Sequence, residues 1–215
     1  MTSQAILVTG GAGYIGSHTA KLLAAAGYLP VAFDNLSTGH ADFVKWGPLE
    51  RGDIGDLAAL TVAMKRHQVQ AVIHFAALAL VGESMERPDL YHRTNVVGTL
   101  NLLYAIAELN PAIHLVKLGT MGEYGSPNID IEEGFIEITH KGRTDVLPFP
   151  KQPNSFYHLS KVHDSHNIAF ACRIWGVRST DLNQGIVYGQ QTPETLMHPD
   201  LATRFDYDAV FGTVL

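Results

Sequence analysis

The fold is decided by residues 5–16, which read AILVTGGAGYIG. The first five residues are mostly apolar, as in a parallel strand that is buried on both faces, and a glycine-rich turn follows. Gly10 permits a tight turn, Gly13 lets backbone amides approach a pyrophosphate, and Gly16 allows a helix to pack closely against the strand. Because the amino end of that helix carries partial positive charge, the stretch predicts a dinucleotide site that Tyr14 and Ile15 also contact.

Outward from this turn, short apolar runs alternate with longer segments of helical period. This alternation is typical of helices packed on a parallel sheet, so the expected fold class is α/β, with a doubly wound Rossmann-type sheet. We expect strands at 5–9, 30–34, 71–75, 112–118 and 178–182, and helices at 14–26, 57–66, 88–108 and 156–175. Residues 126–155 contain prolines at 127, 148, 150 and 153, and we expect them to form a loop over the site.

An acidic residue ends the second expected strand. Asp34 stands 18 positions beyond Gly16, where a carboxylate accepts hydrogen bonds from the ribose hydroxyls of the adenosine. The same carboxylate would repel the 2′-phosphate of NADP, and no Arg or Lys lies between Phe33 and His40 to offset it. The sequence therefore predicts NAD as the cofactor.

A tyrosine and a lysine stand four residues apart at the start of the helix expected at 156–175. Tyr157 and Lys161 therefore project from one helix face, about one turn apart. The Lys161 ammonium and a cationic nicotinamide would both lower the pKa of the Tyr157 phenol, which makes Tyr157 a candidate general base. Thr120 follows an expected strand at the edge where ligands bind, so its hydroxyl is a candidate contact to the same substrate oxygen.

Two asparagines are further candidates for polar contacts. We expect Asn95 to contact the cofactor and Asn183 to contact the substrate. For each of them, a buried amide that is satisfied by the backbone is an equal alternative.

Composition argues against several other classes of protein. The net charge of -6 comes from 21 acidic and 15 basic residues without runs, so nucleic acid is not an expected partner. His158, His163 and His166 share one helix, but no second cluster joins them at ligand spacing, so we expect no metal site. The single cysteine, Cys172, the lack of a signal peptide and the lack of a long apolar run predict a cytoplasmic protein that does not enter the membrane.

The first half of the chain resembles UDP-glucose 4-epimerases, within the extended short-chain dehydrogenases of the NAD-dependent epimerase/dehydratase family. The likeness is carried by TGGAGYIGSH (9–18), DNLSTGH (34–40) and HFAALALVGES (74–84), and it extends to about residue 104. It implies that NAD is held by the residues Gly10, Gly13, Gly16, Asp34, Asn35, Asp53, Ile54, Phe75, Ala76, Ala77 and Asn95. For Asp53 the alternative is a helix cap for residues 57–66.

From about residue 114 the chain instead resembles UDP-sulfoquinovose synthases. The motifs are LGTMGEYGSPNIDIEEG (118–134), SFYHLSKVHDSHN (155–167) and TDLNQG (180–185). The likeness implies that Thr120, Tyr157 and Lys161 carry out hydride transfer and that Tyr157 and Lys161 also bind the cofactor. It implies His158 and Glu123 as candidate acid/base groups. It also implies a reaction in which UDP-glucose is oxidised at C4, loses water, adds sulfite and is reduced again.

The two resemblances leave three hypotheses for the function. Synthesis of UDP-sulfoquinovose is the first hypothesis and 4-epimerisation of UDP-glucose the second. A non-catalytic NAD-binding fragment is the third, because most of the expected substrate domain is missing. A chimera belongs to this third hypothesis as well, because the first half lacks the long insertion expected of the synthases. We expect an NAD-binding domain with the catalytic residues at 1–190 and the start of a largely absent substrate domain at 191–215. Members of these families commonly pair through two helices, which predicts a homodimer.

Overall fold

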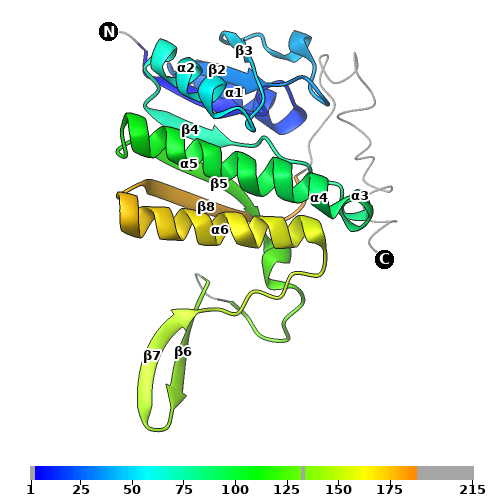
Figure 1. Cartoon of the computed structure of the whole chain (residues 1–215), viewed down its shortest axis with the longest axis vertical. Coiled ribbons are helices and arrows are strands. Elements are labelled where there is room, and N and C mark those ends of the chain that lie inside the picture. Colours follow the sequence, from blue (N-terminus) through cyan, green and yellow to red (C-terminus); the bar gives the residue numbers. More distant parts are fainter. Residues whose placement is uncertain (1–2, 132–133, 188–215) are drawn as a thin grey trace.

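A six-stranded parallel sheet forms the centre of the computed structural model, which describes residues 3–131 and 134–187 (Figure 1). Its order is β3-β2-β1-β4-β5-β8, so the chain builds outward from β1 and then crosses to the other side through β4. The strands are β1 (Ala5–Thr9), β2 (Leu29–Asp34), β3 (Leu49–Arg51), β4 (Ala71–His74), β5 (His114–Thr120) and β8 (Arg178–Gln184), and all neighbours are parallel. The doubly wound α/β fold is therefore confirmed. The three-residue strand β3 was not expected from the sequence.

The helices follow the expected order with one interruption. They are α1 (Tyr14–Ala25), α2 (Leu57–His67), α3 (Val81–Glu86), α4 (Pro88–Tyr91), α5 (Gly98–Leu109) and α6 (Phe156–Trp175), with short 3-10 turns η1 (Ala41–Phe43) and η3 (Met121–Tyr124). The single helix expected at 88–108 is instead α4, a π-helical turn η2 (His92–Val97) and α5. Figure 1 shows α5 and α6 side by side across one face of the sheet. Among the described helices, none is long and apolar enough to span a bilayer.

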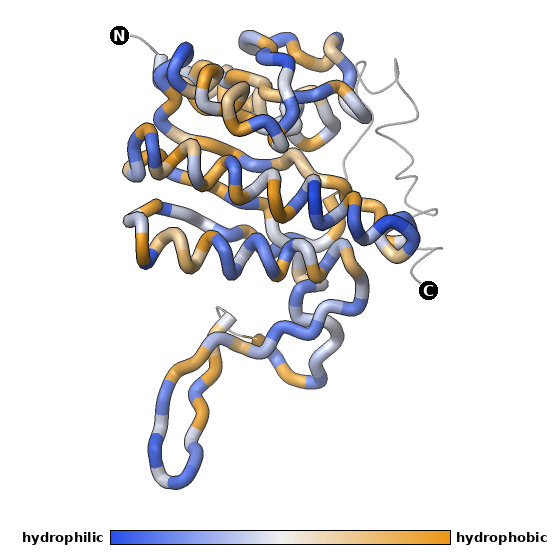
Figure 2. Tube along the Cα trace, viewed as in Figure 1, coloured by the Kyte–Doolittle hydropathy of each residue, from blue (hydrophilic) through white to orange (hydrophobic). Residues whose placement is uncertain are grey.

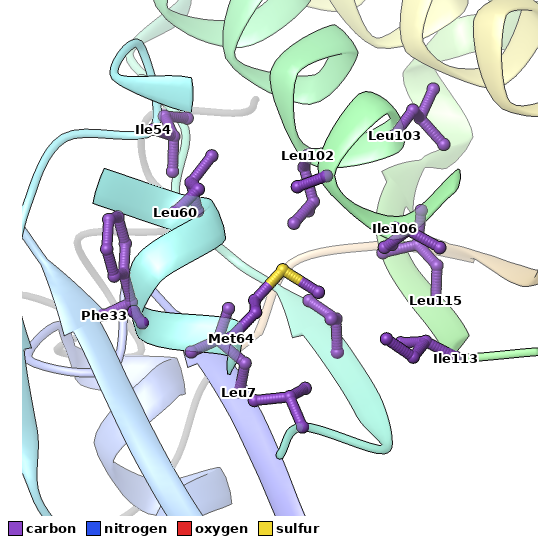
Figure 3. Close-up of a cluster of buried hydrophobic side chains, with 14 of the residues drawn as sticks. Leu7, Phe33, Ile54, Leu60, Met64, Leu102, Leu103, Ile106, Ile113 and Leu115 are labelled. Carbon is purple, nitrogen blue, oxygen red and sulfur yellow. The ribbon is translucent and has the colours of Figure 1, made fainter. Parts of the chain in front are cut away.

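The main hydrophobic core lies between the sheet and helices α2, α5 and α6. Leu7 and Leu115 are fully buried on the strands and meet Met64 and Ile106 from the helices. Figure 3 shows how the side chains of α2 and α5 gather against those of the strands. Close packing of this kind fixes the strand ends, and with them the loops that form the site.

A β-hairpin replaces the loop that was expected at 126–155. Its strands β6 (Phe135–His140) and β7 (Arg143–Pro148) are antiparallel, and Lys141 and Gly142 join them with positive φ angles of 50° and 75°. Two residues with positive φ form the turn that matches the natural twist of a hairpin. Pro148 ends β7, where a proline does not interrupt strand pairing. The hairpin extends away from the sheet, with apolar residues along both strands (Figures 1 and 2), so the expectation of a loop over the site was wrong.

The boundary expected near residue 190 cannot be compared with the fold. Residues 191–215, which we expected to begin a second domain, lie outside the described residues.

Candidate active site

A pocket of about 340 Å³ opens at the carboxyl ends of β1, β2, β4 and β5. This is the edge at which open α/β sheets bind their ligands. Of the fifteen residues expected to hold the cofactor, the pocket is lined by Gly10, Gly13, Tyr14, Ile15, Gly16, Asp34, Asn35, Asp53, Ile54, Phe75, Ala76, Ala77, Tyr157 and Lys161. Asn95 is the exception. The structure thus brings residues from both halves of the chain to one cavity.

The glycine-rich turn leaves the room that a dinucleotide needs. Gly10 has a φ of 70°, and a Cβ there would lie 2.8 Å from the Ala76 amide nitrogen. A Cβ on Gly16 would overlap the carbonyl oxygen of Gly10. No side chain caps the start of α1 at Gly13, so the first amides of the helix stay available to an anionic group. The turn therefore fits the pyrophosphate of NAD.

Asp34 is oriented by the turn that it faces. Its Oδ2 accepts a hydrogen bond of 3.0 Å from the Ala12 amide, and its Oδ1 accepts one of 2.8 Å from the Leu36 amide. Each carboxylate oxygen can accept a second hydrogen bond. The side chain is thus held beside the glycine-rich turn with acceptor capacity left for the hydroxyls of a ribose.

Asp53 belongs to the pocket and not to the cap of α2. Its Oδ2 accepts a hydrogen bond of 2.7 Å from Asn35 Nδ2, and its Oδ1 accepts one of 2.7 Å from the Gly55 amide. Asp56 is the residue that caps α2, through a 3.0 Å hydrogen bond from the Ala59 amide. The interpretation of Asp53 as a helix cap was therefore wrong.

Tyr157 and Lys161 line the pocket from the first turns of α6. Ser155 begins this helix, because its hydroxyl accepts a 3.1 Å hydrogen bond from the His158 amide. The Lys161 side chain is buried, and burial lowers its pKa although the Asp164 carboxylate opposes this effect. The two side chains lie beside Leu118 and Gln184, so α6 brings them to the carboxyl ends of β5 and β8.

The pKa of Tyr157 in the protein alone moves opposite to the expected direction. Burial raises it, and the carboxylates of Glu123 and Asp164 raise it further. Lys161 is not among the groups that offset this rise. The expected lowering by Lys161 was therefore wrong for the protein by itself, because burial and two nearby carboxylates dominate the environment of the phenol.

Glu123 is held in a buried ion-pair network. Its Oε1 accepts a 2.9 Å hydrogen bond from Lys117 Nζ, and its Oε2 accepts hydrogen bonds from Lys151 and from the Ser165 hydroxyl. Lys117 Nζ also donates to Asp181 Oδ2, at 3.2 Å. Burial would raise the pKa of Glu123, but Lys117 and Lys151 lower it overall. Glu123 does not line the pocket, and both of its carboxylate oxygens are held by this network, so its role as an acid/base group stays a prediction.

Thr120, His158 and Asn183 do not line this pocket. The Thr120 hydroxyl accepts a 3.2 Å hydrogen bond from the Gly122 amide and caps η3. His158 Nδ1 lies 2.9 Å from the Ser155 hydroxyl, and burial lowers the pKa of the ring. Asn183 pairs with Thr120's neighbour Gly119 across β5 and β8. Of these three, His158 lies against Tyr157, with ring centroids 5.1 Å apart.

Asn95 is a buried amide that holds two other segments in place. Its Oδ1 accepts a 2.9 Å hydrogen bond from the Leu78 amide, and its Nδ2 donates to the Leu78 carbonyl at 3.0 Å and to the Ser160 hydroxyl at 2.9 Å. Leu78 lines the pocket. Of the two interpretations left open for Asn95, these contacts match the buried amide satisfied largely by the backbone.

The structure adds residues to the pocket that the sequence did not single out. They are Phe33, Ser37, Thr38, Gly39, Gly52, Leu78, Ala79, Thr94, Leu118 and Gln184. Gly39 shows why they were missed: a Cβ there would lie 2.9 Å from Ala12, and the His40 amide donates to the Ala12 carbonyl at 3.0 Å. Only this packing of one loop on another reveals the role of Gly39, although the DNLSTGH motif contained it.

A model of the NAD dependent epimerase/dehydratase family matches residues 6–206. The chain belongs to this family. NAD is therefore its cofactor, and a solved relative from Brucella ovis, a UDP-glucose 4-epimerase, is in complex with NAD. That structure has a TM-score of 0.78 and 40% sequence identity, and the match covers 88% of this chain and 54% of the other.

Two groups of curated relatives correspond to the two resemblances. The chloroplastic UDP-sulfoquinovose synthase of Spinacia oleracea is 49% identical over 237 aligned residues, which cover 98% of this chain and 49% of the synthase. The UDP-glucose 4-epimerase of Rhizobium meliloti is 56% identical over 146 residues, which cover 67% of this chain and 44% of the epimerase. The chain therefore spans about half the length of these relatives.

The synthase similarity is not limited to the second half of the chain, because it covers 98% of it. The alignment of 237 residues is also longer than the chain of 215 residues. The synthase thus contains stretches that this chain lacks, which agrees with the expectation of a missing insertion.

Proposed function

We propose that this chain carries the NAD-binding and catalytic part of a UDP-sulfoquinovose synthase, which converts UDP-glucose and sulfite through a 4-keto sugar. The observation that carries the proposal is the meeting of Tyr157 and Lys161 with the glycine-rich turn in one pocket, within a chain whose similarity to a synthase covers 98% of its length.

We assign the pyrophosphate and the adenosine of NAD to two groups of pocket residues. The glycine-rich turn and the start of α1 hold the pyrophosphate, since their amides are free of side-chain caps. Asp34 accepts hydrogen bonds from the ribose hydroxyls, and the Asn35–Asp53 pair borders the adenosine side of the pocket. Tyr157 and Lys161 then stand at the end that receives the nicotinamide.

Bound NAD supplies the hydride acceptor for oxidation of the sugar. The Tyr157 phenolate takes the proton of the reacting hydroxyl as the sugar is oxidised, and the resulting phenol returns this proton when the sugar is reduced. Because burial raises the pKa of Tyr157 in the protein alone, we assign the positive charge that stabilises the phenolate to the cationic nicotinamide of bound NAD, which Lys161 borders in the same pocket. We assign contacts with the sugar to Thr120 and Asn183, near the ends of β5 and β8, and to His158, whose ring lies against that of Tyr157.

4-Epimerisation of UDP-glucose is the second candidate. It is favoured by the 56% identity to the R. meliloti epimerase over two thirds of the chain. It needs the same hydride and proton transfers but no sulfite.

The test is to incubate the protein with NAD and UDP-glucose, with and without sulfite, and to identify the sugar nucleotides by mass spectrometry. Formation of UDP-sulfoquinovose only with sulfite supports the synthase, and UDP-galactose without sulfite supports the epimerase. NAD binding without turnover by this chain matches the non-catalytic alternative. Failure to bind NAD would contradict the assignment of the pocket.

We also propose that two copies pair through α5 and α6. These adjacent helices expose large apolar side chains: Tyr104 is 52% exposed, Phe170 55% and Ile174 61%. Apolar side chains gathered on one surface are typical of a protein interface. A cytoplasmic location stays a prediction, and the spinach relative is named as chloroplastic.

A further inference from the structure

We propose that Asp164 is the buried counter-charge of Lys161, a positioning residue that keeps the Lys161 side chain protonated at the end of the cofactor pocket. The inference rests on the proposed function, because it concerns how the Tyr157–Lys161 pair is maintained. It assigns a role to a carboxylate that lies outside the pocket.

Asp164 combines deep burial with a lack of hydrogen-bonding partners. Its side chain lies on α6 with only 1% of the residue exposed. Neither Oδ1 nor Oδ2 accepts a well-aligned hydrogen bond from the described residues. Thr99 on α5 stabilises the charge only weakly. A buried carboxylate in this state destabilises the folded protein, because it has lost its hydrogen bonds to water without gaining an equal number from the protein.

Lys161 stands three residues before Asp164, so the two side chains share one face of α6. Lys161 is 4% exposed and lines the cofactor pocket. No direct ion pair within 4.0 Å joins Lys161 and Asp164 in the described part of the chain, so the two side chains interact through charge across the protein interior. Such an interaction is much stronger here than in water.

A second buried lysine makes this counter-charge necessary. Lys117 Nζ donates a 3.1 Å hydrogen bond to the carbonyl oxygen of Lys161, so a like charge is fixed beside the Lys161 backbone. Burial lowers the pKa of Lys161, and Lys117 lowers it again. Asp164 opposes them more strongly than the other two acids, Glu123 and Asp181, do.

The pKa of Asp164 depends on the same charged neighbours. Burial raises its pKa to about 6, and Lys161 is the charge that opposes this rise most, followed by Lys117. Glu123, on η3, raises it further. On the other elements packed on α6, His92 contacts the His163 ring and Glu83 accepts a hydrogen bond from the Tyr91 hydroxyl. His74, on β4, interacts with the Lys161 charge, and burial lowers its pKa to about 3.

The proposal predicts different effects of Asp164 on stability and on Lys161. If Asp164 only supported the fold, removing its charge would lower the free energy of unfolding. Asp164 instead is destabilising while ionised, because its folded pKa of about 6 lies above its ordinary 3.8. Asp164→Asn should therefore unfold no more readily than the unmodified protein above pH 6, while Lys161 loses its counter-charge.

The test follows Lys161 directly in the full 215-residue chain, without cofactor or substrate. Lysine is labelled with ¹³C at Cε, the Lys161 signal is assigned by its loss in Lys161→Met, and its shift is followed against pH. We expect the Lys161 midpoint in Asp164→Asn to fall by at least about one pH unit, a tenfold change in proton affinity. Asp89→Asn, at an exposed acid on α4, is the matched control and should leave the midpoint unchanged.

Three results would overturn the proposal: an unchanged Lys161 midpoint, an Asp164→Asn protein that does not fold, or one that is less stable above pH 6. In the unsubstituted protein, the labelled Asp164 carboxyl should titrate near pH 6, and the Lys161 signal should shift over the same pH range. A Lys161 signal that does not respond to the titration of Asp164 would contradict the proposal. This experiment contains no sugar nucleotide, so its result does not depend on whether the chain is a synthase. A negative result here would likewise leave the synthase assignment unaffected.

Discussion

Replacing Lys117 by methionine should cost about 3–5 kcal/mol of unfolding free energy, the usual cost of removing one partner from a buried ion pair. Lys117 and Glu123 are both fully buried, with Nζ and Oε1 2.9 Å apart. Methionine fills a similar volume but donates no hydrogen bond, so Glu123 keeps only Lys151 and Ser165 as partners. Asp181 loses its 3.2 Å contact as well.

The double variant Lys117→Met/Glu123→Gln should recover part of this loss, because it removes the unpaired charge of Glu123, while Asp181 and Lys151 still lose their partners. We expect a coupling energy of about 2–3 kcal/mol between the two positions. Urea denaturation of both single variants, the double variant and the unsubstituted chain gives this value. Lys21→Met, at an exposed lysine on α1, is the control and should change stability by less than about 0.5 kcal/mol.

Two outcomes would refute the reasoning about the network. A loss below about 1 kcal/mol in Lys117→Met would mean that the buried pair does not support the fold. Strictly additive losses in the double variant would mean that Lys117 and Glu123 stabilise the protein independently of each other.

Three further predictions concern the pocket and the core. Asp34→Asn should narrow the preference for NAD over NADP by about 1–3 kcal/mol, and calorimetric titrations that give an unchanged preference would contradict the role of Asp34. Gly10→Ala should abolish NAD binding while the far-ultraviolet circular dichroism is kept, because its Cβ would meet the Ala76 backbone; normal affinity would show that the turn adapts. Burial lowers the pKa of His74 to about 3, so the unfolded chain binds the additional proton between pH 6.5 and 3. Stability should therefore fall by up to about 1.4 kcal/mol per pH unit on acidification through this window, and urea unfolding of His74→Gln should show a smaller slope.

The parts of the fold that sequence could predict are those with local signals. The glycine turn and Asp34 belong to one strand–turn–helix–strand unit, and their spacing alone placed them at one site. Tyr157 and Lys161 were placed together by helical periodicity. Family resemblance added Asn35, Asp53, Ile54, Phe75, Ala76 and Ala77 before any contact was known.

The remaining features depend on contacts between distant segments. Lys117 was expected only as part of a central strand, and nothing near it in the sequence indicates that Glu123, Ser165 and Asp181 would surround its ammonium. The two interpretations of Asn95 could be separated only by its contacts with Leu78 and Ser160. The hairpin was not predicted, because the prolines at 127, 148, 150 and 153 indicated a broken segment and the positive φ angles of Lys141 and Gly142 are known only from the structure.

The β6–β7 hairpin also has a practical use for protein engineering. Both of its ends join the body on the same side, and Lys151, just after β7, is fixed to Glu123. Its tip at Lys141 and Gly142 lies far from the sheet (Figure 1). A fluorophore, an affinity tag or a short inserted domain could therefore be placed at this tip, where an insertion extends outward and leaves the strand register of the main sheet unchanged.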